Sequence, residues 1–407
     1  MAFRFLHAAD LHLGSPLAGL RIRAPELASL FDRASRRAFE ALVDLAIDEK
    51  VAFVVIAGDV FDQDWQDYAT GQLFVRGLAR LSRAGIRAII IRGNHDAEHV
   101  MTRSLPLPDG MAWLGADAAG TVDLPEVGAA VHGMSFKTRA VTENMIPRYP
   151  AAMPGRFNIG LLHTSLDGRP DHSGYAPCSI ADLARLGYAY WGLGHIHTRE
   201  VVQQDPFVVY PGNIQGRHVR EAGERSATLV TVTDGRVSAI EHRPVDAARW
   251  ALVEVDVSGA ETLDAVHDRA RARLEDAATA AAGRPLAVRV RVIGETVLHD
   301  RLLADRERFA AELQALAAAV SETVAIERVK AETRPPRGFG GIAVALDDLD
   351  EAFAAVLADP AIAADLAADL ALIKGKLPPL AAGRLEGDTE GVLAAARALI
   401  QSRLANP

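Results

Sequence analysis

The fold of this chain is constrained most by a pattern that recurs through its first half, in which a short apolar run is followed at once by a polar cluster. Runs rich in β-branched and aromatic residues, bounded by Gly and Asn, are typical of buried β-strands. Helical stretches separate the first of these runs, and strands that alternate with helices predict an α/β sheet. Functional sites of such sheets usually lie at the carboxyl ends of the strands, where all of these clusters fall. The runs with their clusters are Phe3–Leu6 before Asp10 and His12, Ala52–Ala57 before Gly58-Asp59, Ala88–Ile91 before Gly93–Asp96, Ile159–Leu162 before His163, Ala189–Leu193 before Gly194–His197, and Phe207–Tyr210 before Pro211–Asn213.

The middle of the chain predicts a strand hairpin and then a smaller α+β unit. Asp234-Gly235 is a typical two-residue hairpin turn, and the composition changes near Pro244. Beyond this point, alternating apolar residues indicate strands, and apolar residues at helical spacing indicate helices. The predicted strands cover residues 227–233, 237–242, 251–257, 286–292 and 324–329, and the predicted helices cover residues 263–274 and 300–319.

The last part of the chain begins with a Pro- and Gly-containing linker at residues 334–341. Two short amphipathic stretches follow it, and two interpretations of them stay open. They form a docking element for a partner, or they pack against the preceding unit. We therefore expect domains at residues 1–245, 246–333 and 340–407.

Composition narrows the cellular setting of the protein. The single cysteine, Cys178, cannot form an internal disulfide, which fits a reducing cytoplasm. No apolar run is long enough to cross a bilayer, and the N-terminus lacks the features of a signal peptide. We therefore expect a cytoplasmic protein. The net charge of −9 argues against avid DNA binding by the chain alone, although metal ions or a basic partner can supply positive charge.

The polar clusters contain the side chains that divalent transition metals prefer. Carboxylates mixed with imidazoles suit Mn²⁺, Fe²⁺ or Zn²⁺ better than Ca²⁺. Residues two apart on an extended segment point the same way, so Asp10 and His12 can aim at one centre. Asp59 is the natural candidate to bridge two ions, and two ions roughly 3.5–4 Å apart can hold a hydroxide for in-line attack on phosphorus. The candidate residues are Asp10, His12, Asp59, Asn94, His95, His163, His195 and His197.

These residues carry a resemblance to a known family, the calcineurin-like metallophosphoesterases. The motifs concerned are Asp10-Leu11-His12, Gly58-Asp59-Val60-Phe61-Asp62, Gly93-Asn94-His95-Asp96, His163 and Gly194-His195-Ile196-His197. Residues 8–13 and 210–217 further resemble SbcD-type DNA-repair nucleases, and among them the YhaO-like exonucleases. The resemblance is dense over residues 1–224 and thin afterwards. It implies a four-layer α/β/β/α sandwich, then a small α+β capping domain and C-terminal helices.

The resemblance also implies a role for each site residue. One metal ion would be held by Asp10, His12, Asp59 and His197, and the other by Asp59, Asn94, His163 and His195. His95 would be catalytic, contacting the scissile phosphate and helping the leaving oxygen depart. Asp62 and Asp96 would orient histidines. Asn213 and Arg217 are candidates for binding substrate. Apart from the resemblance, His218 lies beside Arg217 and Arg220 in the sequence and is either a further contact to substrate phosphate or a solvated loop residue. The two divalent ions are expected to be Mn²⁺, with Fe²⁺ or Zn²⁺ as alternatives.

We therefore expect a metal-dependent DNA exonuclease or endonuclease that acts in DNA repair with an SMC-like, SbcC-type ATPase subunit. The chain has no Walker-type Gly-rich loop, so ATP hydrolysis would belong to that partner. The resemblance further suggests a homodimer. The alternatives are a phosphodiesterase of small molecules, such as cyclic nucleotides or nucleotide-sugar lipids, and a non-catalytic scaffold subunit. The complete set of ligand residues argues against the scaffold.

Overall fold

The computed structural model describes residues 2–15, 33–62, 68–97, 106–167 and 174–336, together with isolated positions and short helical stretches at 367–372 and 395–399. The chain divides into two compact units, and the boundary lies between Trp250 and Ala251. The domain limits expected from the sequence stay predictions, and most of the segment 340–407 lies outside the described residues. Within the described part of the chain, no helix is long and apolar enough to cross a membrane.

The first unit is built on two six-stranded β-sheets. The first sheet has the order β12 (Arg236–Pro244), β11 (Ser226–Thr233), β1 (Ala2–Ala8), β2 (Phe53–Ala57), β3 (Arg87–Ile91) and β4 (Met111–Trp113). The second has the order β5 (Gly120–Leu124), β6 (Ala129–Gly133), β7 (Phe157–His163), β8 (Tyr190–Gly194), β10 (Phe207–Tyr210) and β9 (Glu200–Gln204). The central strands of each sheet pair in parallel, so their carboxyl ends lie at one edge.

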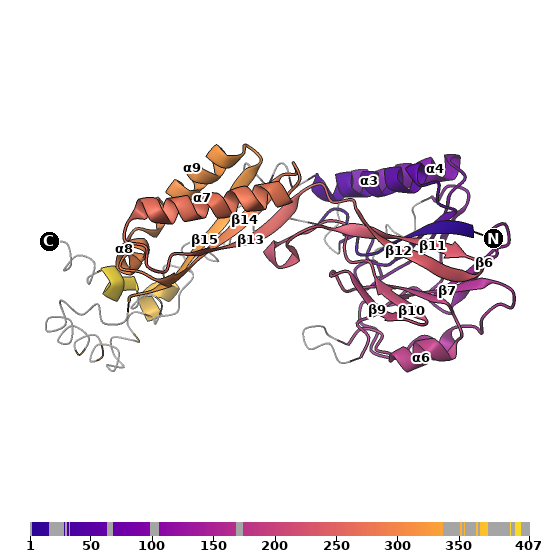
Figure 1. Ribbon diagram of the computed structural model, residues 1–407. Coiled ribbons are helices and arrows are strands. Elements are labelled where there is room, and N and C mark those ends of the chain that lie inside the picture. Colours follow the sequence, from indigo (N-terminus) through magenta and orange to yellow (C-terminus); the bar gives the residue numbers. More distant parts are fainter. Residues whose placement is uncertain are drawn as a thin grey trace. The chain divides into compact units, whose positions relative to one another are not determined.

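The central strands of both sheets are buried on both faces, whereas the edge strands β12, β5 and β9 are partly exposed. Successive side chains of a strand point to opposite faces, so Val55 of β2 packs between the sheets while Ile56 packs under helices. Trp191 of β8 lies in the apolar cluster on the outer face of the second sheet. Figure 1 shows α3 and α4 on one side of the sheets and α6 on the other, which confirms the predicted four-layer sandwich. The bounds of these helices are α3 (Ala34–Asp48), α4 (Tyr68–Arg83) and α6 (Ile180–Arg185).

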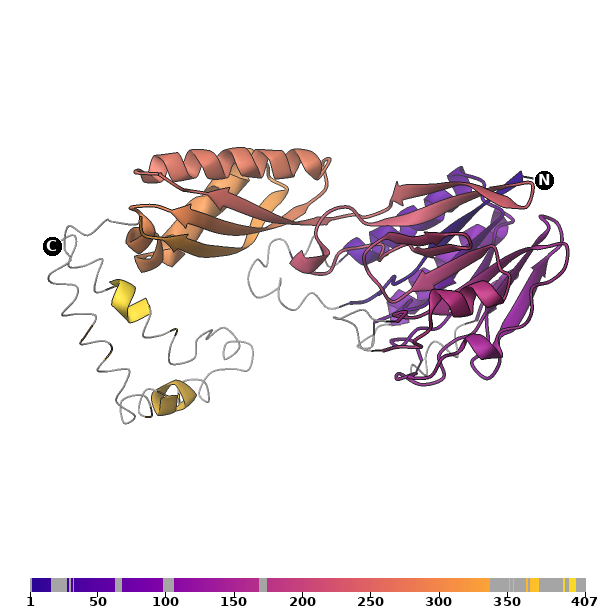
Figure 2. The ribbon, with the colours of Figure 1, turned by 60° about the horizontal axis from the view of Figure 1, so that its bottom comes forward.

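The second unit is a three-stranded sheet with helices on one face. Its strands lie in the order β13 (Arg249–Asp256), β14 (Leu286–Glu295) and β15 (Val324–Arg334), and its helices are α7 (Leu263–Ala280), α8 (His299–Ala304) and α9 (Arg306–Val320). Val288 and Val290 of β14 pack with α7 and α9, and Figure 2 shows α7 lying along the sheet. The helix predicted at 300–319 is two helices, because Asp305 interrupts it and caps α9 by accepting a hydrogen bond from the amide of Arg308.

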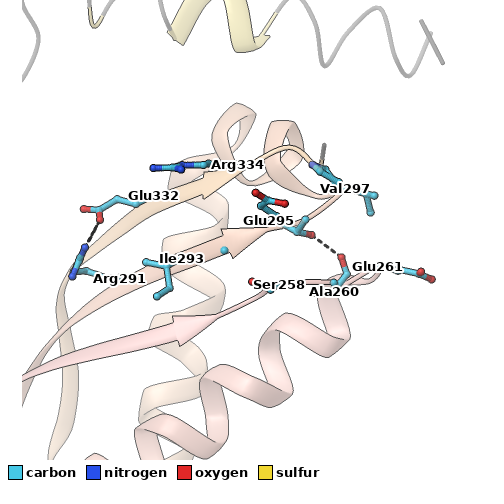
Figure 3. Close-up of a pocket in the computed structure, with 13 residues that line it drawn as sticks. Ser258, Ala260, Glu261, Arg291, Ile293, Glu295, Val297, Glu332 and Arg334 are labelled. Atoms are coloured by element: carbon cyan, nitrogen blue, oxygen red, sulfur yellow. Dashed lines mark hydrogen bonds and ion pairs between the residues drawn. The ribbon is translucent and has the colours of Figure 1, made fainter. Parts of the chain in front are cut away.

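A pocket of about 780 Å³ lies on the other face of this small sheet (Figure 3). Arg291 on its side is paired with Glu332 at 2.7 Å, and nearby on β14 Arg289 is paired with Glu327 at 2.8 Å. Each guanidinium is therefore balanced by a neighbouring carboxylate, and these two arginines do not form a surface of net positive charge.

Candidate metal centre

Polar residues that follow five different strands meet at the carboxyl edge of the two sheets. Main-chain hydrogen bonds between neighbouring strand ends bring them together: the amide of Asp10 donates to Gly58 O at 3.0 Å, and the amide of His12 donates to Asp59 O at 3.0 Å. The amide of His195, from the second sheet, donates to both carboxylate oxygens of Asp10 at 3.0 and 3.1 Å. Residues of both sheets thus contribute to one site.

Four of the expected ligands have an unusual backbone. The φ angles of Asp10, His12, Asp59 and His195 are 52°, 42°, 51° and 95°, in the left-handed region that residues with a Cβ atom seldom adopt. Such conformations cost free energy and persist where the surrounding structure enforces them, which is typical of functional sites. Here the strain turns each side chain toward the shared edge.

The first group of candidate ligands contains Asp10, His12 and His197. The Nε2 atoms of His12 and His197 lie 3.1 Å apart, and His197 Nε2 lies 4.0 Å from Asp10 Oδ1. Asp10 and His12 are each 1% exposed, and His12 Nδ1 is buried without a hydrogen-bond partner among the described residues. The nitrogen of His12 that faces the other candidate ligands is Nε2, so a metal ion in this group would be held by Nε2 and not by Nδ1.

The second group contains Asp10, Asp59 and His163. His163 Nδ1 donates to Ala57 O at 2.9 Å, which leaves Nε2 facing Asn94 Oδ1 at 3.0 Å and Asp59 Oδ2 at 3.4 Å. The same Asp59 oxygen lies 3.9 Å from His12 Nε2. Asp59 therefore stands between the two groups, as expected of a bridging ligand, and His195 lies beside His163 with ring centroids 5.2 Å apart.

The donor set fits divalent transition metals, because it combines carboxylate and amide oxygens with neutral imidazoles. Burial raises the pKa of Asp10 to about 6, whereas burial and then the charge of Arg217 lower the pKa of His12 well below its usual range. Burial opposes charge on Asp59 and His163 as well, but their mutual attraction lowers the pKa of Asp59 and raises that of His163 to about 9. Divalent ions would displace the protons that these groups otherwise share.

Three glycines enclose His163 with main chain. A Cβ atom on Gly58, Gly93 or Gly194 would come within 2.8 Å of the His163 imidazole. The Cβ atom on Gly194 would also overlap the carbonyl oxygen of Ala57. The Gly residues in the motifs are therefore required by close packing of strand ends around one ligand.

His95 lies on the accessible side of the site. Its Nδ1 donates to Asp62 Oδ1 at 3.0 Å, and Arg217 Nη1 donates to the other oxygen of Asp62 at 3.3 Å. Burial opposes charge on His95, but the hydrogen bond to Asp62 raises the pKa of the imidazole overall. The side chains of His95, His197 and Arg217 are 20–24% exposed, and that of His218 is 53% exposed. These four form the wall that a substrate can reach.

The expected roles of Asp96 and Asn213 stay predictions, and the structure adds the contacts that each residue makes. Asp96 was expected to orient a histidine, but its carboxylate accepts hydrogen bonds from the amides of Val60, Phe61 and Gly93, so it holds the loops after β2 and β3. Asn213 was expected to bind substrate, but it is fully buried. Its Nδ2 donates to Gln215 O and to Glu221 Oε2, which makes it a support for the loop after β10.

Sequence reasoning missed Glu221, which is buried beside His197. Glu221 Oε1 accepts a hydrogen bond from His197 Nδ1 at 2.7 Å, and the side chain of Glu221 is 6% exposed. Burial would raise the pKa of Glu221, but the hydrogen bond from His197 holds it well below its usual range. In the sequence this residue stands among Arg217, His218 and Arg220, where charged residues are typical of a solvated loop.

Comparison with known proteins gives matches over both units. Residues 3–199 match the family model for calcineurin-like phosphoesterases, and residues 250–334 match that for the middle domain of the metallophosphoesterase YhaO. The chain is 35% identical over 271 residues to the uncharacterized metallophosphoesterase YhaO of Bacillus subtilis, covering 64% of this chain and 65% of that protein. It is 26% identical to the DNA double-strand break repair protein Mre11 of Sulfurisphaera tokodaii, covering 63% and 66%, and 27% identical to the SbcD component of the nuclease SbcCD of Bacillus subtilis, covering 61% and 69%. The match spans slightly less than two thirds of the length of the first two relatives.

Proposed function

This chain carries a calcineurin-like phosphoesterase domain and a YhaO-type middle domain, as its motifs predicted, and we propose that it hydrolyses phosphodiester bonds in DNA. One observation carries the proposal: two groups of buried carboxylates and imidazoles share Asp10, and His95 stands beside them on the accessible side. Metal ions at the carboxylates and imidazoles would bind a phosphate, and His95 lies close enough to donate a proton to it. The activity is proposed for this chain from its own residues and from its kinship with Mre11 and SbcD.

The ligands in this proposal are those expected from the motifs. They are Asp10, His12, Asp59 and His197 for one ion and Asp59, Asn94, His163 and His195 for the other. When bound, two divalent ions, Mn²⁺ in our proposal and Fe²⁺ or Zn²⁺ as alternatives, supply positive charge that activates water and neutralises the phosphate. Ligand histidines must be neutral for this, and the hydrogen bond from His163 Nδ1 to Ala57 O fixes the tautomer that leaves its Nε2 free.

His95 is the proposed proton donor. Its Nδ1 is held by Asp62, so its Nε2 is the atom that can donate to the leaving oxygen of the phosphodiester. The pKa raised by Asp62 keeps more of the imidazole protonated near neutral pH, as a donor requires. Arg217 and His218 are the proposed contacts to substrate phosphates, since both are accessible at the site. Arg217 pairs with Asp62, which holds His95, and His218 pairs with Glu221, which holds His197. Asn213 supports the loop that carries them.

DNA is favoured over small phosphodiesters by the second unit and by kinship. A small-molecule phosphodiesterase needs no middle domain, whereas this chain has one that matches YhaO. In the second unit Arg289 and Arg291 are paired with carboxylates, and the chain as a whole has a net charge of −9. We therefore propose that an SMC-like, SbcC-type ATPase subunit supplies much of the positive surface for DNA in the cytoplasm, in DNA repair. A homodimer stays a prediction.

The test is cleavage of end-labelled linear duplex DNA in Mn²⁺ by the wild-type protein and by the His95→Ala variant. His242→Ala serves as a matched control, because this histidine pairs with Glu224 away from the metal centre. The proposal expects shortening of DNA by the wild type and by the control, and loss of roughly 10²-fold in rate for His95→Ala with both ions still bound. Loss of the ions would show that His95 is a ligand, as its grouping with His12 and Asp62 would allow.

A simple aryl phosphodiester separates the alternatives. If the wild type splits it but leaves DNA intact even with an ATPase partner added, the substrate is a small molecule and the DNA proposal is wrong. If neither compound is hydrolysed although two ions are bound, the chain is a scaffold.

A further inference from the structure

Glu221 lies directly behind His197, on the side away from the other ligands. His197 Nδ1 donates to Glu221 Oε1 at 2.7 Å, while His197 Nε2 faces His12 and Asp10. Imidazole can hold a metal through only one nitrogen when the other carries the proton. The carboxylate therefore selects the tautomer in which His197 Nε2 has a free lone pair.

Both oxygens of Glu221 are fully engaged. Oε2 accepts hydrogen bonds from Asn213 Nδ2 at 3.0 Å and from the amide of Arg217 at 2.7 Å. The short helical turn that contains Glu221, residues Val219–Glu221, is fixed by Arg225, which donates to Glu221 O and to the carbonyl oxygen of His197. The carboxylate thus cannot move without breaking several contacts, and neither can the ring that it holds.

Arg217 connects Glu221 to Asp62, the carboxylate that orients His95. Arg217 Nη2 lies 3.7 Å from Glu221 Oε1, and Arg217 Nη1 donates to Asp62, which holds His95. Two of the imidazoles on the accessible wall, those of His95 and His197, are therefore oriented by two carboxylates with one guanidinium between them. This arrangement differs from that of His163, which is oriented by main chain.

We propose that Glu221 is a positioning residue that orients His197 as a metal ligand, and that its loss weakens one of the two metal sites without unfolding the loop. The inference rests on the metal centre of the proposed function. The competing explanation is that Glu221 only stabilises the loop after β10.

The variant Glu221→Gln tests this, because Gln has one acceptor oxygen where three donors converge. If that oxygen faces His197, the amide NH₂ group opposes Asn213 and Arg217. If it faces them, the NH₂ group opposes His197 Nδ1 and favours the tautomer whose Nε2 cannot bind metal. The matched control is Glu224→Gln, since Glu224 also accepts a 2.7 Å hydrogen bond from a histidine, His242, that is not a candidate ligand.

The measurement is calorimetric titration of metal-free protein with Mn²⁺, together with thermal unfolding of the metal-free protein. We expect two sites in the wild type and in Glu224→Gln. In Glu221→Gln we expect one of the sites to be weakened 10- to 100-fold while the other keeps its wild-type affinity. We also expect a small fall in the metal-free unfolding temperature from the donor that the amide opposes. Wild-type affinity at both sites in Glu221→Gln would overturn the proposal, and so would loss of both sites together with a lowered unfolding temperature.

A second variant covers the case in which Glu221→Gln does not fold. Glu221→Asp keeps the charge but withdraws the carboxylate by one methylene, so we expect a smaller loss at the same site, and an unchanged site would refute the role. Failure here is distinct from failure of the proposed function. If the wild type binds two ions but cleaves no phosphodiester, the proposed hydrolysis is wrong and the titration still tests the role of Glu221. If the wild type binds no Mn²⁺, both proposals are wrong.

Discussion

His7 provides a quantitative prediction about acid stability. It lies on β1 between the two sheets, is 0% exposed, and is joined across them by a 3.0 Å hydrogen bond between its Nδ1 and the hydroxyl of Tyr190 on β8. Burial lowers the pKa of His7 to about 3. The folded protein therefore keeps this imidazole neutral over a range of pH in which the unfolded chain protonates it.

The sign and size of the effect follow from that difference. Between the unfolded pKa of 6.5 and the folded pKa of about 3, the unfolded state binds more protons, so stability falls as the pH is lowered through this window. At pH 5 the unfolded chain gains about 2 kcal/mol from protonating His7, and at pH 7 it gains almost nothing. This contribution is a substantial part of the marginal stability of a folded domain.

The perturbation is His7→Gln, which keeps a group able to bond Tyr190 but removes the titration. Urea unfolding at pH 7 and pH 5, in metal-free buffer and followed by circular dichroism, gives the free energy of unfolding at each pH. We expect the loss of stability between the two pH values to be smaller in the variant by about 2 kcal/mol. Tyr190→Phe is the control, because it removes the hydrogen bond and keeps the titrating ring. Equal losses in wild type and His7→Gln would refute the reasoning.

Three further predictions concern the metal centre. Gly194→Ala should destabilise the protein by about 1–3 kcal/mol in urea unfolding and abolish the ion beside His163, because its Cβ overlaps the Ala57 carbonyl. Gly174→Ala, whose Cβ would meet no described residue within 4 Å, should match the wild type. Chelation should abolish hydrolysis, and Mn²⁺ at 100 times its Kd should raise the free energy of unfolding by about 2.7 kcal/mol for each bound ion; an unchanged Tm would show that no ion binds. Hydrolysis should fall below about pH 6, since protonated imidazoles cannot bind metal, and full activity at pH 5 with the ions retained would contradict the ligand assignment.

In the first half of the chain the sequence predicted those strands whose residues are apolar on both faces. In the second half, alternation and a hairpin turn predicted strands with one solvated face, such as β12 and β14. β2 and β3 are continuous runs of large apolar residues because each packs against the other sheet on one side and against helices on the other. It did not predict β6, whose residues Ala129–Gly133 are mostly small and carry little β-preference, nor the three-residue β4. The arrangement in two sheets depends on pairing between distant segments, which local periodicity does not encode. It was expected only from the family resemblance.

The site could be predicted to the extent that its residues directly follow strands. Asp10 and Asp59 do so, His163 is the last residue of its strand, and the geometry of parallel strands brings the three together. The supporting roles of Glu221 and Asn213 could not be predicted from the sequence in this way. One is a charged residue in a charged loop and the other a polar residue after a strand, and both would ordinarily face water. Only the three-dimensional structure shows that they are buried against each other behind His197.

The metal centre holds its histidines in two ways. His163 is held by main chain, whereas His197 and His95 are held by side chains that can be exchanged. The Nδ1 atom of His163 is held by the carbonyl oxygen of Ala57 and closely enclosed by glycine main chain, so no exchange of a side chain acts directly on the group that orients this ligand. Around His197 and His95 the supports are the side chains of Glu221, Asp62 and Arg217, each of which can be lengthened, shortened or neutralised singly. Attempts to retune metal preference or substrate should therefore begin at these three positions.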